Sequence, residues 1–230
     1  MKIGIIGAMS CETDALKKML QNRKTEIISG VEYAYGNLFG KEAVIATCGI
    51  GKVFAAVCAQ TMILRFAPDV IINTGVAGTL TSKLSPCDIA ISENVVQHDM
   101  DTSAIGDPVG LISGINIIKI PSDEKLCSLV ASCAEKIGLS ALCGTIASGD
   151  VFVADQAKKE YIKNCFDAVA CEMEGASIGQ VCYINSIPFV VIRAISDGGD
   201  DEAAMSYDKF VILAAENSVK LVCEMISSIS

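Results

Sequence analysis

Apolar, β-branched runs alternate along the chain with segments in which apolar residues recur at helical spacing. Residues 2–7, 70–75 and 188–195 are the clearest such runs, and they predict buried strands. Weaker patterns predict further strands at 32–39, 42–48, 87–96, 142–148 and 168–171. Helical spacing predicts helices at 12–20, 52–66, 122–137, 155–163, 174–183 and 206–229. Glycine and proline in residues 97–115 predict a loop.

Strands that alternate with helices indicate an α/β protein. Buried strands need cover on both faces, so we expect a central mixed sheet with helices on each side. The chain shows no repeat and no linker rich in Pro, Gly or Ser, and we expect a single domain over residues 1–230. In such sheets ligands bind beyond the carboxyl ends of the strands, so the residues after each strand are the candidates for a site.

Four carboxylates follow these predicted strands. Glu12 comes after the first strand, Glu172 and Glu174 follow the run at 168–171, and Asp197 ends the most apolar run in the chain. Taken singly, Glu12 and Glu174 are also explained as acidic residues that open helices. Gathered at one edge of a sheet, however, carboxylates repel one another and raise one another's pKa. The set therefore suggests acid–base chemistry on a sugar.

Two glycine turns, at residues 49–52 and 75–78, also follow predicted strands. Neither fits the GxGxxG pattern of dinucleotide sites or the P-loop, which argues against binding of nucleotide phosphates. Each turn is either a tight strand-to-helix connection or a backbone lining for an uncharged ligand.

Composition narrows the class of partner. The net charge of −9 argues against nucleic acid and against a membrane surface as partners. No apolar run reaches the roughly 18–20 residues of a membrane span. The 11 cysteines are scattered and include no C-x-x-C pair, so we expect reduced thiols in a cytoplasmic protein. His98 is the only histidine, and we expect neither a metal nor an organic cofactor.

Six segments carry a more specific signal, because they match one known family in order and across nearly the whole chain. They are residues 1–9, 49–53, 68–75, 148–150, 172–174 and 188–197. The chain resembles the bacterial 5′-methylthioadenosine/S-adenosylhomocysteine nucleosidases of the nucleoside phosphorylase-like superfamily. The resemblance implies a three-layer αβα sandwich and a homodimer. It also implies hydrolysis of the N-glycosidic bond of these nucleosides, and of 5′-deoxyadenosine as a further candidate, with release of adenine in methionine salvage.

The same resemblance gives roles to the carboxylates. Asp197 would protonate N7 of adenine, and the apolar end of its strand supplies the desolvation that keeps a carboxyl group protonated near neutral pH. Glu12 would take a proton from the attacking water. Glu174 would bind the ribose hydroxyls, with Met173 packed against the sugar. The anionic pocket would stabilise the positive charge of an oxocarbenium-like transition state.

The remaining contacts implied by the resemblance surround the base, the tail and the partner subunit. Phe152 would stack on the purine, the Val153 backbone would bond the adenine edge, and Ser196 would orient Asp197 or the base. The other substrate-binding residues would be Met9, Ile50 and Tyr207 around the 5′-alkylthio tail, together with Gly78 and Glu172. Phe152 and Tyr207 are also explained as ordinary core aromatics.

The family resemblance also gives a role to two residues of the expected loop. Thr102 and Ile105 match positions that reach across the interface in relatives, so we expect them near the partner's site. The loop also carries Val109 and Met100, and exposed apolar residues in a loop usually mark an interface.

Four features depart from the family pattern, and they leave substrate preference open. Val76 stands where several relatives carry serine, and Thr79 replaces a frequent glycine. The pair at 198–199 adds flexibility after Asp197, and Tyr207 brings a hydroxyl where phenylalanine is common.

Three alternatives remain open at this point. A purine nucleoside phosphorylase would need cations for phosphate, whereas Glu12 would repel phosphate and Arg193 is explained as a structural ion-pair partner. A non-catalytic nucleoside-binding protein would not need Glu12 and Asp197, which are both present. A hydrolase with the same site could also cleave 6-amino-6-deoxyfutalosine.

Overall fold

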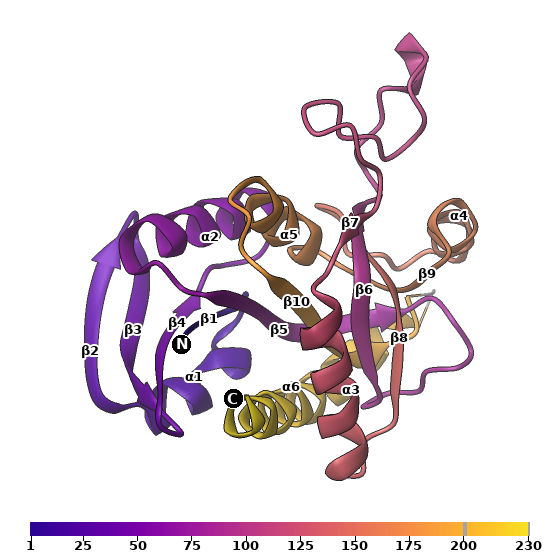
Figure 1. The fold of residues 1–230 in the computed structure, drawn as a ribbon. Coiled ribbons are helices and arrows are strands. Elements are labelled where there is room, and N and C mark those ends of the chain that lie inside the picture. The colour runs from indigo at the N-terminus through magenta and orange to yellow at the C-terminus, as the bar shows by residue number, and fades with distance from the viewer. Residues whose placement is uncertain (200–201, 230) are drawn as a thin grey trace.

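Residues 1–199 and 202–229 are described by the structure, a computed structural model. Ten strands of this part of the chain form one mixed sheet (Figure 1). The strands are β1 (Lys2–Gly7), β2 (Gln21–Ile28), β3 (Val31–Leu38), β4 (Lys41–Thr47), β5 (Val70–Thr79), β6 (Ile89–Gln97), β7 (Ile120–Pro121), β8 (Ala141–Ser148), β9 (Ala168–Glu172) and β10 (Phe189–Asp197). The helices are α1 (Ser10–Met19), α2 (Lys52–Phe66), η1 (Ser103–Ile105), α3 (Glu124–Lys136), α4 (Gln156–Phe166), α5 (Gly175–Ile184) and α6 (Ala203–Ser228).

The sheet has two different ends. At one end β1 lies parallel to both β4 and β5, and β4, β3 and β2 continue as an antiparallel meander. At the other end β5 pairs with both β9 and β10, and β10, β6, β8 and β9 complete a closed ring of five strands. The ring brings three strand ends together, because Gly78 of β5 is in register with both Asp197 of β10 and Cys171 of β9.

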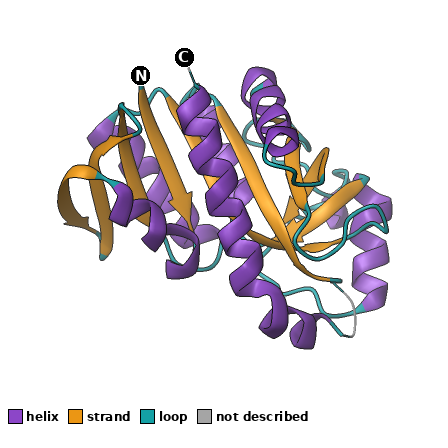
Figure 2. Cartoon of the chain, turned by 90° about the horizontal axis from the view of Figure 1, so that it is seen from below, coloured by secondary structure: helices purple, strands orange, loops and turns teal. Residues whose placement is uncertain are grey.

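Helices cover both faces of the sheet. One face is covered by α1, α3 and α6, and α6 runs along it as the longest helix (Figure 2). Ile3 and Ile5 of β1 pack there against Leu16 of α1 and Leu221 of α6. The opposite face is covered by α2 and α5, which pack against each other above the sheet in Figure 1. The expected three-layer αβα arrangement with a central mixed sheet is confirmed.

The element pattern agrees with the sequence prediction except at two strands, β2 and the two-residue β7. All six predicted helices are present, and α2 has the predicted bounds. The strand β2 was missed, because nearly all its side chains are exposed and no alternation of apolar and polar residues marks it. It is an edge strand that pairs only with β3, and it is further held by ion pairs from Glu26 to Arg65 and from Arg23 to Glu32.

The segment between β6 and β7 leaves the body of the protein and projects away from it (Figure 1). It holds the short helix η1 and a single β-bridge between Ile112 and Ile117, as expected for a loop. Ile105 is 82% exposed. None of the described helices is both long and apolar enough to span a membrane.

Candidate active site

One pocket lies where the carboxyl ends of β1, β5, β9 and β10 meet, as expected for an α/β sheet. All twelve residues that the sequence suggested for catalysis or substrate binding line it. Five further residues also line it, namely Ala8, Val76, Ala77, Val151 and Cys171. Four of these five directly precede a predicted residue in the sequence, so they could have been predicted from their position in the chain. Thr102 and Ile105 are not part of this lining; they lie in the projecting segment, where Thr102 donates to Asp107.

Glu12 sits in the first turn of α1 and is only 2% exposed. Its Oε2 accepts bonds from the backbone N–H of Ala8 at 2.7 Å and of Met9 at 2.9 Å, while Oε1 accepts one from Val76 N–H at 3.1 Å. Burial raises the pKa of Glu12, and the nearby Arg193 and these N–H groups oppose that rise. A Cβ at Gly75 would lie 2.6 Å from Oε1, so only glycine leaves room for the carboxylate. Glu12 therefore opens a helix and also lines the pocket.

Asp197 ends β10 at the junction of the three strands and is 3% exposed. Ser196 donates its hydroxyl to Oδ2 at 2.8 Å, and the Gly199 N–H donates to Oδ1 at 2.9 Å. A Cβ at Gly78 would lie 2.6 Å from Oδ1, so glycine makes room for this side chain as well. Burial, followed by the charges of Asp197 and Glu172, raises the pKa of Cys171, and its thiol is therefore neutral.

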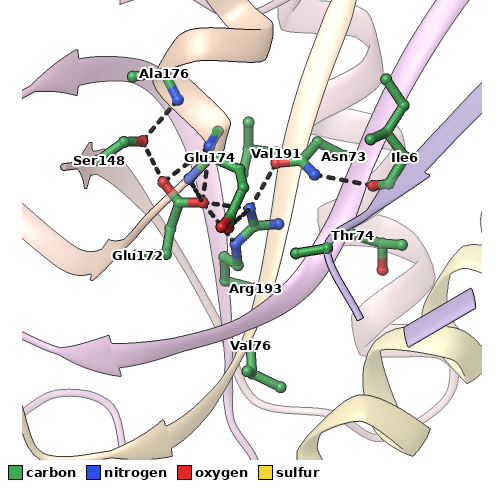
Figure 3. Close-up of polar contacts among 12 residues, drawn as sticks. Ile6, Asn73, Thr74, Val76, Ser148, Glu172, Glu174, Ala176, Val191 and Arg193 are labelled. Atoms are coloured by element: carbon green, nitrogen blue, oxygen red, sulfur yellow. Dashed lines mark hydrogen bonds and ion pairs between the residues drawn. The ribbon is translucent and has the colours of Figure 1, made fainter. Parts of the chain in front are cut away.

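Behind the pocket, Glu172 and Arg193 form a fully buried ion pair (Figure 3). Oε2 of Glu172 accepts bonds from Arg193 and from Glu174 N–H, and Oε1 accepts one from Ser148 Oγ. Arg193 also donates to Asn73 Oδ1 at 2.6 Å. Although burial alone would raise it, the pKa of Glu172 is held below its usual range by Arg193 and these donors. Both oxygens of Glu172 are thus engaged by the protein, and Arg193 is the structural ion-pair partner expected from the sequence.

Glu174 is a buried carboxylate whose pKa lies well above its usual range. Burial, followed by the charge of Glu172, raises its pKa to about 7. Its Oε1 accepts a bond from Gly51 N–H at 2.8 Å, and its Oε2 lies 3.9 Å from Nη2 of Arg193. Glu174 therefore changes charge near neutral pH.

Aromatic and sulfur-containing side chains form the outer part of the pocket. Phe152 and Tyr207 meet edge to face, with ring centroids 5.6 Å apart. The Tyr207 hydroxyl donates to the sulfur of Met9 at 3.3 Å. Ile50 is 54% exposed and Phe152 is 45% exposed, so this part of the pocket opens to solvent. It offers apolar surface and one hydroxyl to a ligand.

The charged lining determines which ligands fit. None of the described lining residues is Lys or Arg, and Arg193 lies behind the pocket with its charge paired. Among residues 1–199 and 202–229, no three His, Cys, Asp or Glu side chains are placed to hold a metal ion together. The arrangement can take up and release protons at buried carboxyl groups, and it can stabilise a cationic centre.

Comparisons with known proteins agree with this geometry. The model of the phosphorylase superfamily matches residues 2–227. A 5′-methylthioadenosine/S-adenosylhomocysteine nucleosidase of Psychromonas ingrahamii is 41% identical over 232 residues, which cover 100% of both chains. A structure of such a nucleosidase from Neisseria meningitidis, in complex with methylthio-immucillin-A, is 37% identical with a TM-score of 0.96 over 99% of each chain. A structure of futalosine hydrolase from Helicobacter pylori is 36% identical with a TM-score of 0.95, over 100% of this chain and 98% of that one.

Fold, pocket and family model together define a member of the phosphorylase superfamily, with a sheet that presents carboxyl groups at its strand ends. Within that superfamily, the chain belongs to the family of 5′-methylthioadenosine/S-adenosylhomocysteine nucleosidases.

Proposed function

We propose that this protein hydrolyses the N-glycosidic bond of 5′-methylthioadenosine and S-adenosylhomocysteine, releasing adenine and the 5′-thio-ribose. The observation that carries the proposal is a pocket lined by four buried carboxyl groups and, among its described lining residues, by no cation. Such a lining favours a cationic transition state and water as the nucleophile.

The leaving group needs a proton donor, and we assign this role to Asp197. Its position in the closed ring of strands, with Ser196 and Gly199 fixing its two oxygens, holds the carboxyl group in one orientation. When the bond between N9 of adenine and C1′ of the ribose breaks, its electron pair moves into the base. N7 takes the proton of Asp197, and adenine leaves as a neutral molecule.

The other side of the sugar needs a base and a hydroxyl acceptor. Glu12 takes a proton from water as the water oxygen bonds to C1′, and its three backbone donors keep the carboxylate in place. Glu174 accepts bonds from the ribose hydroxyls in its ionised state. After reaction Glu12 carries one more proton and Asp197 one fewer, and exchange with solvent restores both groups.

Phosphorolysis is the closest alternative, and the charge distribution disfavours it. Phosphate binding requires cationic donors at the pocket, but the guanidinium of Arg193 is bonded to Glu172 and Asn73. Glu12 would also repel a phosphate at the position of the water. We therefore expect adenine release without phosphate.

The test is an assay of adenine release with purified protein in buffers with and without phosphate. We expect equal rates in both and free 5′-thio-ribose as the sugar product. Formation of a ribose 1-phosphate, or a rate that depends on phosphate, would reject hydrolysis in favour of phosphorolysis. Binding of the nucleosides with no turnover would support a nucleoside-binding protein instead.

A second substrate class deserves the same assay. The Helicobacter pylori protein of nearly equal TM-score is a futalosine hydrolase. The outer part of the pocket is open to solvent, so it can admit a larger 5′ substituent than a methylthio group. Rates for methylthioadenosine, adenosylhomocysteine, 5′-deoxyadenosine and 6-amino-6-deoxyfutalosine will rank these substrates.

We further propose that the protein is a homodimer in which the projecting segment helps to close the partner's pocket. Apolar side chains are exposed on α2 and in that segment, namely Val53, Phe54, Val57, Leu64 and Ile105. Exposed apolar side chains gathered on α2 favour an interface over a solvated surface. Symmetry would then give both pockets the same partner residues, with Thr102 and Ile105 next to the 5′ tail.

Replacement of Ile105 by aspartate tests this arrangement. We expect weaker association in sedimentation velocity and a higher KM for 5′-alkylthio substrates, with a smaller effect on adenosine, which lacks the tail. A wild-type monomer that is fully active at the assay concentration would contradict the dimer.

We also propose a cytoplasmic location and a reaction without a cofactor. All 11 cysteines are free thiols, many of them buried, as expected in a reducing compartment. Full activity after treatment with a chelator would support the absence of a metal requirement. Activity that a chelator abolishes and a divalent cation restores would contradict it.

A further inference from the structure

Three charged residues outside the pocket lining form a closed ring of interactions. The Lys52 ammonium group lies 2.7 Å from Oδ1 of Asp99, and the Asp150 N–H donates to Oδ2 of Asp99 at 2.9 Å. The ring closes where the Lys52 N–H donates to Oδ1 of Asp150 at 2.8 Å. These residues come from the start of α2, the segment after β6 and the segment after β8.

Further bonds anchor Lys52 to its neighbours. Its ammonium group also donates to Oε1 of Gln97 at 3.1 Å, and its carbonyl accepts the hydroxyl of Ser177 from α5 at 2.7 Å. The side chains of Lys52 and Asp99 are 19% and 24% exposed, so water screens their ion pair only in part.

The ring touches the proposed site at two points. Gly51 precedes Lys52, has a φ of 102° and donates its N–H to Glu174. The Asp150 carboxylate accepts the Lys52 N–H, the first of α2, and so holds the peptide that joins Gly51 to Lys52, next to the peptide whose N–H bonds to Glu174. On its other side, Asp150 stands two residues before Phe152, which lines the pocket. The ring of interactions therefore connects Gly51, which bonds to Glu174, with the segment that carries Phe152.

We propose that Lys52, Asp99 and Asp150 are positioning residues for nucleoside cleavage. They keep the Gly51 N–H bonded to Glu174, and they keep the segment that carries Phe152 at the pocket. This inference rests on the proposed function, because Glu174 and Phe152 are its two substrate contacts. None of the three residues lines the pocket or touches the reacting atoms. They act through Gly51 and through the segment after β8.

Loss of the ring of interactions would change the pKa of Glu174. The charged and titratable groups that act on Glu174 are Glu172 of β9, Arg193 of β10, Glu12 of α1 and Cys48 after β4. The Gly51 N–H opposes the rise in the pKa of Glu174 that burial causes. If the ring is broken and this N–H moves away, the pKa of Glu174 rises further, and the carboxylate forms only at higher pH.

Asp99→Asn is the main test variant, because an amide in place of the carboxylate can accept only one of the two bonds. We expect KM to rise about ten-fold with kcat little changed, the scale of one lost bond to a charged group. The acidic limb of the pH profile of kcat/KM should move to higher pH. A purely electrostatic effect would have the opposite sign, because removal of a negative charge lowers the pKa of a nearby carboxyl group.

Two lysine variants and one distant variant complete the experiment. Lys52→Met removes the cation and should behave like Asp99→Asn, whereas Lys52→Arg keeps a cation and should restore most of the affinity. Glu224→Gln removes an equally short but exposed ion pair to Lys136, remote from the pocket, and should leave KM within about two-fold. The proposal would be overturned if the acidic limb of the pH profile of Asp99→Asn stayed in place or moved to lower pH. It would also be overturned if kcat fell by as large a factor as KM rose.

Hydrogen exchange in the ligand-free protein gives a readout that does not depend on the reaction. The amides of Gly51 and Lys52 should exchange at least about ten-fold faster in Asp99→Asn than in the wild type. Unchanged exchange would overturn the ring as a positioning device even if KM rises. A wild-type protein that releases no adenine would instead refute the proposed function, and the exchange result would still decide whether the ring holds Gly51.

Discussion

The two parts of the pocket differ in how their side chains are held. The inner wall, formed by Glu12, Glu172, Glu174 and Asp197 with Arg193 behind them, is buried, and every one of these side chains is bonded to the protein. The mouth, formed by Met9, Ile50, Phe152 and Tyr207, is more open to solvent, and its side chains are joined by a hydrogen bond from the Tyr207 hydroxyl to the Met9 sulfur. The wall consists of carboxyl groups held by hydrogen bonds, whereas the mouth is mainly apolar and half-exposed.

This difference suggests a division of tasks. Charges act strongly only where water is excluded, so groups that move protons and stabilise a cation must be buried and fixed. Contacts with a 5′ substituent need area rather than charge, and half-exposed apolar side chains supply it. We therefore expect wall variants to change stability or kcat, and mouth variants to change KM and the order of substrates.

The largest effect is expected when the buried cation behind the wall is removed. Arg193→Met leaves Glu172 without its partner in a fully buried position, which should lower the free energy of unfolding by about 3–5 kcal/mol. Urea unfolding followed by circular dichroism measures it, and the double variant with Glu172→Gln should recover part of the loss. A change below about 1 kcal/mol would show that the wall does not depend on this pair.

Asp197→Asn tests the proton donor of the wall. It keeps the size of the side chain but cannot protonate the base, so kcat should fall by at least about 10²-fold. The fold should remain intact in circular dichroism, and KM should change far less than kcat. Near-normal turnover would mean that N7 receives its proton from another group.

The pH dependence sharpens the role of Glu174. Its pKa is about 7, so kcat/KM should fall as the pH drops below that value and the carboxylate becomes protonated. Stability should follow the opposite course. The folded-state pKa lies above the ordinary value of 4.5, so the wild type loses stability as the pH rises from there through about 7. Glu174→Gln lacks this loss and should be the more stable protein at pH 8; urea midpoints at pH 5 and pH 8 compare the two.

The smallest effect is expected in the mouth. Tyr207→Phe keeps the edge-to-face contact with Phe152 and removes only the bond from the hydroxyl to the Met9 sulfur, a weak acceptor. We expect kcat to stay the same and the ratio of KM values for methylthioadenosine and adenosylhomocysteine to change by about two- to five-fold. A drop in kcat comparable to that of Asp197→Asn would erase the distinction between wall and mouth.

The grouping of the carboxylates at one edge of the sheet could be predicted because they follow predicted strands. The runs at residues 2–7 and 188–195 are apolar enough to mark buried strands, and Glu12 and Asp197 come at their carboxyl ends, while Glu172 and Glu174 follow the weaker run at 168–171. The roles of Asp197 and Glu12 came from the family resemblance, and they stay predictions. The strand β2 could not be predicted in this way, since its side chains are exposed and its backbone pairing with β3 leaves no periodic signal.

The sequence alone determined the α/β class, because local periodicity is a property of the chain, and its resemblance to known nucleosidases gave the family and twelve of the residues that line the pocket. Tertiary structure decided the closure of five strands into a ring that places Gly78 beside both Asp197 and Cys171. It also showed that Glu172 is engaged by Arg193 and Ser148, while Glu174 remains shifted to a pKa of about 7. The physical reason is that burial and charge pairing depend on residues far apart in the chain, whose distances only the fold fixes.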